Sequence, residues 1–105
     1  MQCYSCYNDI PPNLERCPIC GVPIKGHYEF KKLQKILKDP ESGIRIWGIQ
    51  KITAFTKRFP DFKSQAIFEL EMLNLDLDEF VRTNAYNAIK FLKGELREIT
   101  FSRGN

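Results

Sequence analysis

The sequence lacks the features that mark several common classes of protein. Its one histidine, His27, and its serines, which have no histidine near them in sequence, offer no catalytic pair, and its six glycines form no phosphate-binding loop. No apolar run reaches the roughly 20 residues that a membrane-spanning helix needs. The formal net charge of +3 is too small to indicate a polyanionic partner by itself. We therefore expect a small soluble protein that is not an enzyme and binds no membrane.

Cysteine is scarce, but its placement indicates metal binding. The chain has four cysteines in two C-x2-C pairs, with ten residues between the pairs, and the ligand candidates are Cys3, Cys6, Cys17 and Cys20. Each C-x2-C turn points two thiolates at one spot, so two facing turns supply the four sulfur ligands of a structural zinc ion. We predict one such zinc (Zn2+) per chain. A rubredoxin-like iron site and disulfide bonds are the alternatives.

The residues around the second cysteine pair complete a metal-binding turn. Pro18 presets the turn and Gly21 permits the positive φ that turns backbone amides toward sulfur, whereas the first pair lacks both residue types. With this spacing, residues 3–24 resemble the short zinc ribbons found at the termini of prokaryotic proteins. The resemblance implies a zinc-ribbon (β-knuckle) module, predicted at residues 1–27. No signal peptide is visible, so we expect a cytoplasmic location, where thiolates stay reduced and bind metal.

Beyond Gly26, apolar residues recur at helical spacing and predict a first helix that ends near Asp39. Its predicted buried face holds Phe30, Leu33, Ile36 and Leu37. A second helix is predicted from Asp39, as the N-cap, to Phe59, because the proline that follows Asp39 suits a first helical position. The predicted buried face of this helix holds Ile44, Trp47, Ile52 and Phe55.

A third helix is predicted from Asp61 to about Leu75, with a buried face of Ala66, Ile67, Leu70 and Leu73. The fourth is predicted from Asp76 to about Lys93, with Glu79 in the position of a capping box. The tail from 95 to 105 fits either a continued helix or an extended segment. The chain is therefore predicted to be mainly α, with residues 28–105 forming two helical hairpins, at about 28–58 and 61–94, and a tail.

The second and fourth predicted helices are related by an internal repeat. A shift of 37 positions matches Asp39 with Asp76 and Arg45 with Arg82, and it also matches Ile44 with Val81, Gly48 with Ala85, Ile52 with Ile89, and Phe55 with Leu92. This pattern resembles the second helix of a HEAT repeat, in which a turn aspartate and an arginine six residues later recur. The resemblance implies a four-helix HEAT-like array, in which each aspartate caps a helix and each arginine reaches the neighbouring repeat. An unrelated four-helix bundle is the alternative.

The small number of repeats suggests a role for the N-terminal module. Two repeats are fewer than the roughly three that a helical array usually needs, so its open end should be covered. We therefore predict that the ribbon packs on the array and that each completes the other's core, with the ribbon contributing Ile10, Leu14, Ile19, Val22 and Ile24. Removal of the metal should then disturb the first helix as well as the ribbon.

Two kinds of binding function fit these features. The first is an adaptor or scaffold module that binds another protein through an outward surface of its second and fourth helices, with the candidate residues Ile46, Ile49, Gln50, Tyr86, Asn87 and Lys90. Apolar residues off the predicted buried stripe favour such a surface, although a wide buried face or a homodimer would also cover them. We expect the chain to be a monomer or a homodimer.

The second kind is nucleic-acid binding by the ribbon and the first helix, through Lys31, Lys32, Lys35 and Lys38. Tyrosines of the ribbon would stack on bases beside these lysines. The acidic second hairpin and the modest net charge count against this function, because a basic stripe usually dominates a dedicated nucleic-acid-binding domain. The sequence therefore favours the protein-binding adaptor.

Overall fold

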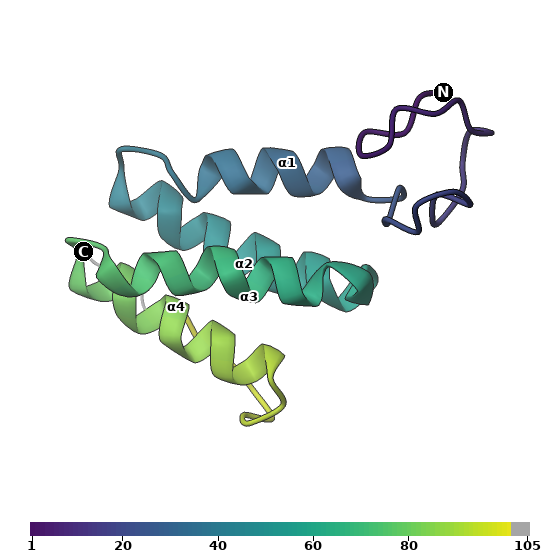
Figure 1. Ribbon diagram of the computed structural model, residues 1–105. Coiled ribbons are helices and arrows are strands. Elements are labelled where there is room, and N and C mark those ends of the chain that lie inside the picture. The colour runs from purple at the N-terminus through teal and green to yellow at the C-terminus, as the bar shows by residue number, and fades with distance from the viewer. Residues whose placement is uncertain (102–105) are drawn as a thin grey trace.

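The computed structural model describes residues 1–101 and shows a mainly α-helical chain with a small non-helical module at its N-terminus (Figure 1). The helices are α1 (His27–Ile36), α2 (Ser42–Arg58), α3 (Lys63–Met72) and α4 (Glu79–Leu92), which confirms the prediction of four helices. Two 3-10 turns, η1 (Pro60–Phe62) and η2 (Leu73–Leu75), flank α3. Residues 102–105 of the predicted tail lie outside the described residues.

The helices form two layers. Figure 1 shows α1 and α3 running side by side in the same direction, with their first turns toward the N-terminal module. A hydrogen bond of 3.0 Å from Gln34 Nε2 to Glu69 Oε1 joins these two helices. The second layer consists of α2 and α4, and α2 also packs against α1 and α3. Within residues 1–101, no helix is long and apolar enough to cross a membrane.

One apolar core fills the space between the layers. Its centre holds the wholly buried rings of Phe30, Phe55 and Phe62, one from each of α1, α2 and η1. The buried faces predicted for the first and third helices are confirmed, with Ile36 and Ile67 half-buried at the edge of this core. Gly48 lies at the closest approach of α2 to α1, because a Cβ atom there would lie 2.7 Å from Ile36 Cγ2.

The buried face predicted for the second helix is partly wrong. Ile52 and Phe55 are buried, but Ile44 is half-buried and Trp47 is exposed. Ile46 and Ile49, placed by the sequence analysis on an outward binding surface, are instead 3% and 0% exposed. The reason is that α2 is covered both by the first layer and by α4, so apolar residues are buried around most of its circumference.

Arginines 37 positions apart make matching contacts at the starts of α2 and α4. Arg45 Nη1 donates to the carbonyl of Asp39 at 2.7 Å, and Arg82 Nη1 donates to the carbonyl of Asp76 at 2.6 Å. Arg45 also reaches the second hairpin, where its Nη2 and Nε lie 2.9 and 2.8 Å from the two carboxylate oxygens of Asp76. The predicted contact of Arg45 with the neighbouring hairpin is thus present.

The helix caps differ from the predicted ones. Asp78, and not Asp76, is the N-cap of α4, and its carboxylate accepts hydrogen bonds from the amides of Phe80 and Val81. These amides, Val81 first, hold the pKa of Asp78 below its usual range. The carboxylates of Asp39 and Asp76 each accept from the amide two residues later, so both aspartates shape the turn that precedes the helix. Glu79 begins α4 at the first helical position, two places too early for a capping box.

The tail does not continue α4. The helix ends at Leu92, Gly94 has a positive φ of 80°, and no helix follows in residues 95–101. Ile99 and Phe101 pack at the edge of the helical core.

Candidate metal centre

Two nearly identical turns, 14 residues apart, build the N-terminal module. In the first, the amide of Cys3 donates to the carbonyl of Asn8, and the amide of Tyr7 donates to the carbonyl of Cys3. In the second, Cys17 pairs with Val22 and Gly21 with Cys17 in the same way. Each turn is closed by one isolated antiparallel bridge, Gln2 with Asp9 and Arg16 with Pro23. Within residues 1–101 the structure has these isolated bridges but no extended β-strand, so the two turns do not belong to a β-sheet.

The same backbone conformation is reached by different residues in the two turns. Gly21 has a φ of 81°, and Tyr7, the matching residue of the first turn, has a φ of 62°. A side chain in this left-handed region costs on the order of 1 kcal/mol relative to glycine. The first turn therefore adopts the predicted geometry even though it lacks the proline and the glycine.

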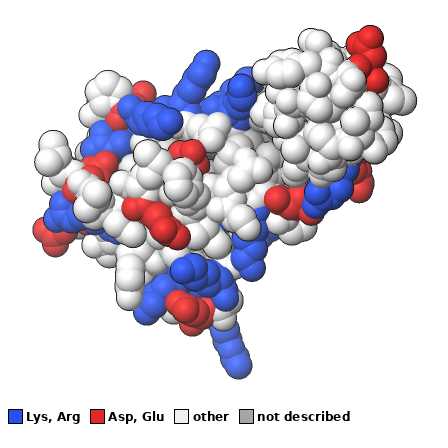
Figure 2. Space-filling view, in the orientation of Figure 1, with Lys and Arg blue, Asp and Glu red and all other residues white. Residues whose placement is uncertain are grey.

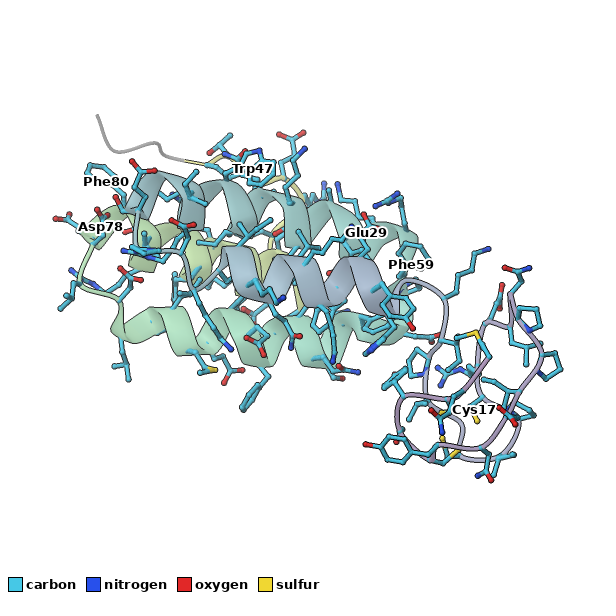
Figure 3. The ribbon with its side chains drawn as sticks, turned by 90° about the horizontal axis from the view of Figure 1, so that it is seen from above. Cys17, Glu29, Trp47, Phe59, Asp78 and Phe80 are labelled. Atoms are coloured by element: carbon cyan, nitrogen blue, oxygen red, sulfur yellow. The ribbon has the colours of Figure 1, made fainter. Side chains whose placement is uncertain are left out.

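The four cysteine sulfurs converge on one point. Their Sγ atoms all lie within 4.8 Å of one another, with Cys3 and Cys20 at 3.6 Å and Cys6 and Cys17 at 3.7 Å. A disulfide would need about 2.05 Å between sulfurs, whereas four sulfurs around a tetrahedral zinc are about 3.8 Å apart. The cluster thus has the size of a four-sulfur metal site and could hold one metal ion (Figure 3, near the labelled Cys17).

Backbone amides surround the sulfurs and favour their ionised form. The amides of Ser5 and Ile19 donate to the Sγ atoms of Cys3 and Cys17, both at 3.4 Å. Hydrogen bonds from the backbone and then the side chain of Asn8 lower the pKa of Cys6 to about 6. For Cys20, the amide of Val22 lowers the pKa, but burial and the three neighbouring sulfurs raise it to about 11.

The lowered pKa of Cys6 and the raised pKa of Cys20 show why a bound cation would stabilise the cluster. Amide hydrogen bonds can stabilise the first thiolates, but mutual repulsion opposes full ionisation of four adjacent sulfurs. A divalent metal would remove this repulsion and release the remaining protons. Cys3, Cys6, Cys17 and Cys20 would then be its complete ligand set, leaving no position open for a substrate.

The N-terminal module has its own small core. Cys3, Ile10, Cys17 and Ile24 form an apolar cluster, with Leu14 and Val22 half-buried against it, while Ile19 stays exposed. The helical core is a separate cluster. The prediction that the two parts complete one another's core is therefore wrong, because the two equivalent turns bury Ile10 and Ile24 against the cysteines and not against the helices.

Three local contacts attach the module to the helices. The ring of Tyr4 stacks on His27, the first residue of α1, with centroids 3.4 Å apart and planes 2° apart. Arg16 forms an exposed ion pair with Asp61. Gly26 passes the ring of Phe59, which Figure 3 shows at the junction. His27 thus has a packing role, and Tyr4 is not free to stack on a base.

The remaining candidate binding residues differ in how exposed they are. The four lysines of the nucleic-acid alternative are all exposed, three on α1 and the last just after it: Lys31, Lys32, Lys35 and Lys38. Of the residues proposed on the second and fourth helices, Tyr86 is exposed, whereas three are only half-buried: Gln50, Asn87 and Lys90. Of the predicted binding surface, Ile46 and Ile49 are therefore buried, while Lys90 and Tyr86 are in contact with one another on α4.

Three exposed apolar residues on and after α3 were not predicted from the sequence. Phe68, Met72 and Leu75 are 64%, 54% and 89% exposed on α3 and the following 3-10 turn. Their spacing of four and three residues places them on one helical face, opposite the buried Ala66 and Leu70. The period-37 shift could have revealed them, because it aligns them with Lys31, Lys35 and Lys38.

Comparisons with known proteins found no relative of this chain. No protein-family model, no curated protein and no solved structure matches the chain. The site is therefore described by its own residues, as a four-cysteine cluster at the N-terminal end of a four-helix array.

Proposed function

We propose that this chain is a non-enzymatic adaptor that binds another protein through its helical array, with one structural zinc ion in the N-terminal module. The sulfur separations of 3.6 and 3.7 Å fit a tetrahedral ion with metal–sulfur bonds of about 2.3 Å, as in a structural zinc site. The ten residues between the two cysteine pairs favour zinc over a rubredoxin-like iron site, whose pairs are much farther apart in sequence. The pair of matching knuckles supports a short zinc ribbon that has two bridges in place of a sheet.

The helical part is proposed to be a HEAT-like pair of hairpins. Three observations support this. The first is that α1 lies beside α3 and α2 packs on α4. The others are the matching Arg45 and Arg82 contacts and the ion pair from Arg45 to the next hairpin. On α4, the positions that match the buried Ile46 and Ile49 of α2 are Thr83 and Tyr86, and both are exposed. A more polar outer face is expected of a terminal repeat.

The observation that carries the proposed function is the apolar stripe of Phe68, Met72 and Leu75. A helix that buries one apolar face normally exposes polar residues on the other, as α1 does with its lysines. On α3 the exposed face instead carries Phe68 and Met72 among polar residues, and Leu77, 98% exposed, lies just beyond the stripe. Exposed apolar side chains that neighbour one another at helical spacing suit a protein–protein interaction site.

This function predicts that charge on the stripe abolishes partner binding. Immobilised wild-type protein should retain a partner from a nuclease-treated lysate of the native host, and the Phe68→Glu/Met72→Glu variant should lose it. A loss of about 30-fold in affinity is expected for two central apolar contacts. The melting temperature should change little, because both side chains are exposed in the free protein.

The matched control places the same charges on the second layer. Trp47→Glu/Tyr86→Glu also replaces two exposed aromatic residues but leaves α3 intact, and it should retain the partner. Loss of the partner in the control alone would show that α2 and α4 form the binding face. A partner that survives both substitutions would contradict the proposed function.

The exposed lysines of α1 support nucleic-acid binding as a second candidate function. Figure 2 shows basic side chains gathered along the edge of the molecule over α1. A partner retained only when nuclease is omitted would favour this candidate. Its affinity should then fall steeply with salt, with a slope of roughly one per phosphate contact.

A further inference from the structure

Two stripes of different chemistry occupy matching places on α1 and α3. Lys31, Lys35 and Lys38 are exposed along α1 and its C-terminal turn. The residues 37 positions later are Phe68, Met72 and Leu75. Because α1 and α3 run side by side in the same direction (Figure 1), the basic stripe and the apolar stripe are parallel neighbours.

The seam between the two helices is hollowed. One shallow depression is lined by Gln34, Gln65, Phe68 and Glu69. A second, at the end where the helices turn, is lined in part by Leu37, Lys38, Leu75 and Leu77. Residues of both stripes therefore border depressions along the same seam. Each stripe extends over eight residues, or about 10 Å of helix, so a partner helix of roughly three turns would cover both.

We propose that the α1–α3 seam binds an amphipathic helix of a partner protein that is apolar on one face and acidic on one flank. The inference rests on the proposed function and specifies its partner. Apolar residues at helical spacing would cover Phe68, Met72 and Leu75, while acidic side chains pair with Lys31, Lys35 and Lys38. The apolar contacts supply most of the affinity, and the lysines set the orientation and the choice of partner.

Acidic charge on α3 narrows the class of partner further. Glu71 is exposed on α3 beside the apolar stripe, and Glu69 lies in the seam itself, where it accepts a hydrogen bond from Gln34. They would repel a nucleic acid or an anionic membrane, which presents negative charge over a whole surface. A helix with acidic groups on one flank avoids them, because only one orientation places those groups over α1. The two signs of charge across the seam therefore favour one direction of binding.

Synthetic helical peptides test this proposal. The acidic probe carries leucines at positions i, i+4 and i+7 with glutamates along one flank; one comparison peptide has the same composition scrambled, and another has lysines in place of the glutamates. Fluorescence anisotropy should show the acidic probe binding at least about ten-fold more tightly than either comparison peptide. Amide shifts in a ¹⁵N spectrum should cluster on α1 and α3.

Reversing the charge of Lys31, Lys35 and Lys38 tests whether these lysines select the acidic peptide. The Lys31→Glu/Lys35→Glu/Lys38→Glu variant should reverse the preference and bind the lysine-bearing peptide about ten-fold more tightly than the acidic one. The matched control, Lys51→Glu/Lys57→Glu/Lys93→Glu, changes net charge equally but alters exposed lysines of α2 and of the residue after α4. It should keep the wild-type preference.

Four results would overturn the proposal. The first two are equal binding of the acidic and basic peptides, and amide shifts confined to α2 and α4. The third is displacement of the acidic peptide by a short DNA duplex or by anionic vesicles. The fourth is self-association of the wild-type protein that the Met72→Glu substitution abolishes. The proposed function fails separately: if Phe68→Glu/Met72→Glu loses the native partner but the lysine reversal retains it, the adaptor function stands and this inference does not.

Discussion

Replacing Cys17 with serine is expected to unfold residues 1–25 while α2, α3 and α4 remain folded. The module has only a small apolar cluster of its own, whereas ligation of a structural zinc supplies roughly 10–16 kcal/mol of apparent free energy. The helical core is separate and should survive. In a ¹⁵N spectrum, amides of the module should move to random-coil positions, and on α1 the change should be confined to the first turn, where His27 loses its stack with Tyr4.

The control for this experiment is Ile19→Ser, which alters an exposed residue of the same turn that supplies no sulfur. Its spectrum should resemble that of the wild type. Retention of dispersed module amides in the Cys17→Ser protein would contradict a metal-dependent fold. Loss of dispersion throughout the chain would instead show that the module and the array form one cooperative unit, as the sequence alone suggested.

The second large effect is expected from Asp76→Ala. This substitution removes the carboxylate that pairs with both Nε and Nη2 of Arg45, whose side chain is only 15% exposed. Breaking a buried ion pair by removing one partner costs about 3–5 kcal/mol, because the other charge is left without compensation. Since this pair lies at the edge of the core, we expect a loss of about 3 kcal/mol in the free energy of unfolding, measured by urea denaturation.

The first hairpin offers a matched control. Asp39 occupies the equivalent turn, and its carboxylate accepts the amide of Glu41, but within residues 1–101 it forms no ion pair with an arginine. Asp39→Ala should therefore cost only about 1 kcal/mol. Adding Arg45→Met to Asp76→Ala should recover part of the lost stability, because the unpaired charge is then gone. Equal losses for the two aspartates would show that Arg45 contributes nothing across the hairpins.

The spacing of residues predicted the helices and the cysteine cluster, but not everything around them. The faces of α1 and α3 could be predicted because each helix buries a single stripe, such as Phe30 with Leu33. The α2 helix is buried on several sides, so its apolar residues follow no single stripe, and Ile46 and Ile49 were misplaced. Periodicity alone does not reveal that kind of burial.

Cap identity and the contacts between parts also depended on tertiary structure. The segment Asp76-Leu77-Asp78 offers two possible caps, and Asp76 is withdrawn from that role by Arg45, 31 positions earlier in the chain. The attachment of the module depends on a Tyr4–His27 stack, which no local pattern indicates. By contrast, the four metal-binding candidates were predictable because each C-x2-C turn fixes its own geometry.

Native mass spectrometry of the purified chain tests the central claim, that Cys3, Cys6, Cys17 and Cys20 together hold one zinc ion. Protein purified without added metal should carry one zinc per chain and should lack protons that ligation displaces from the thiols. Acidification should release the metal, because protons compete for the thiolates. A metal-free chain with two disulfides, or a chain that carries iron, would contradict the account.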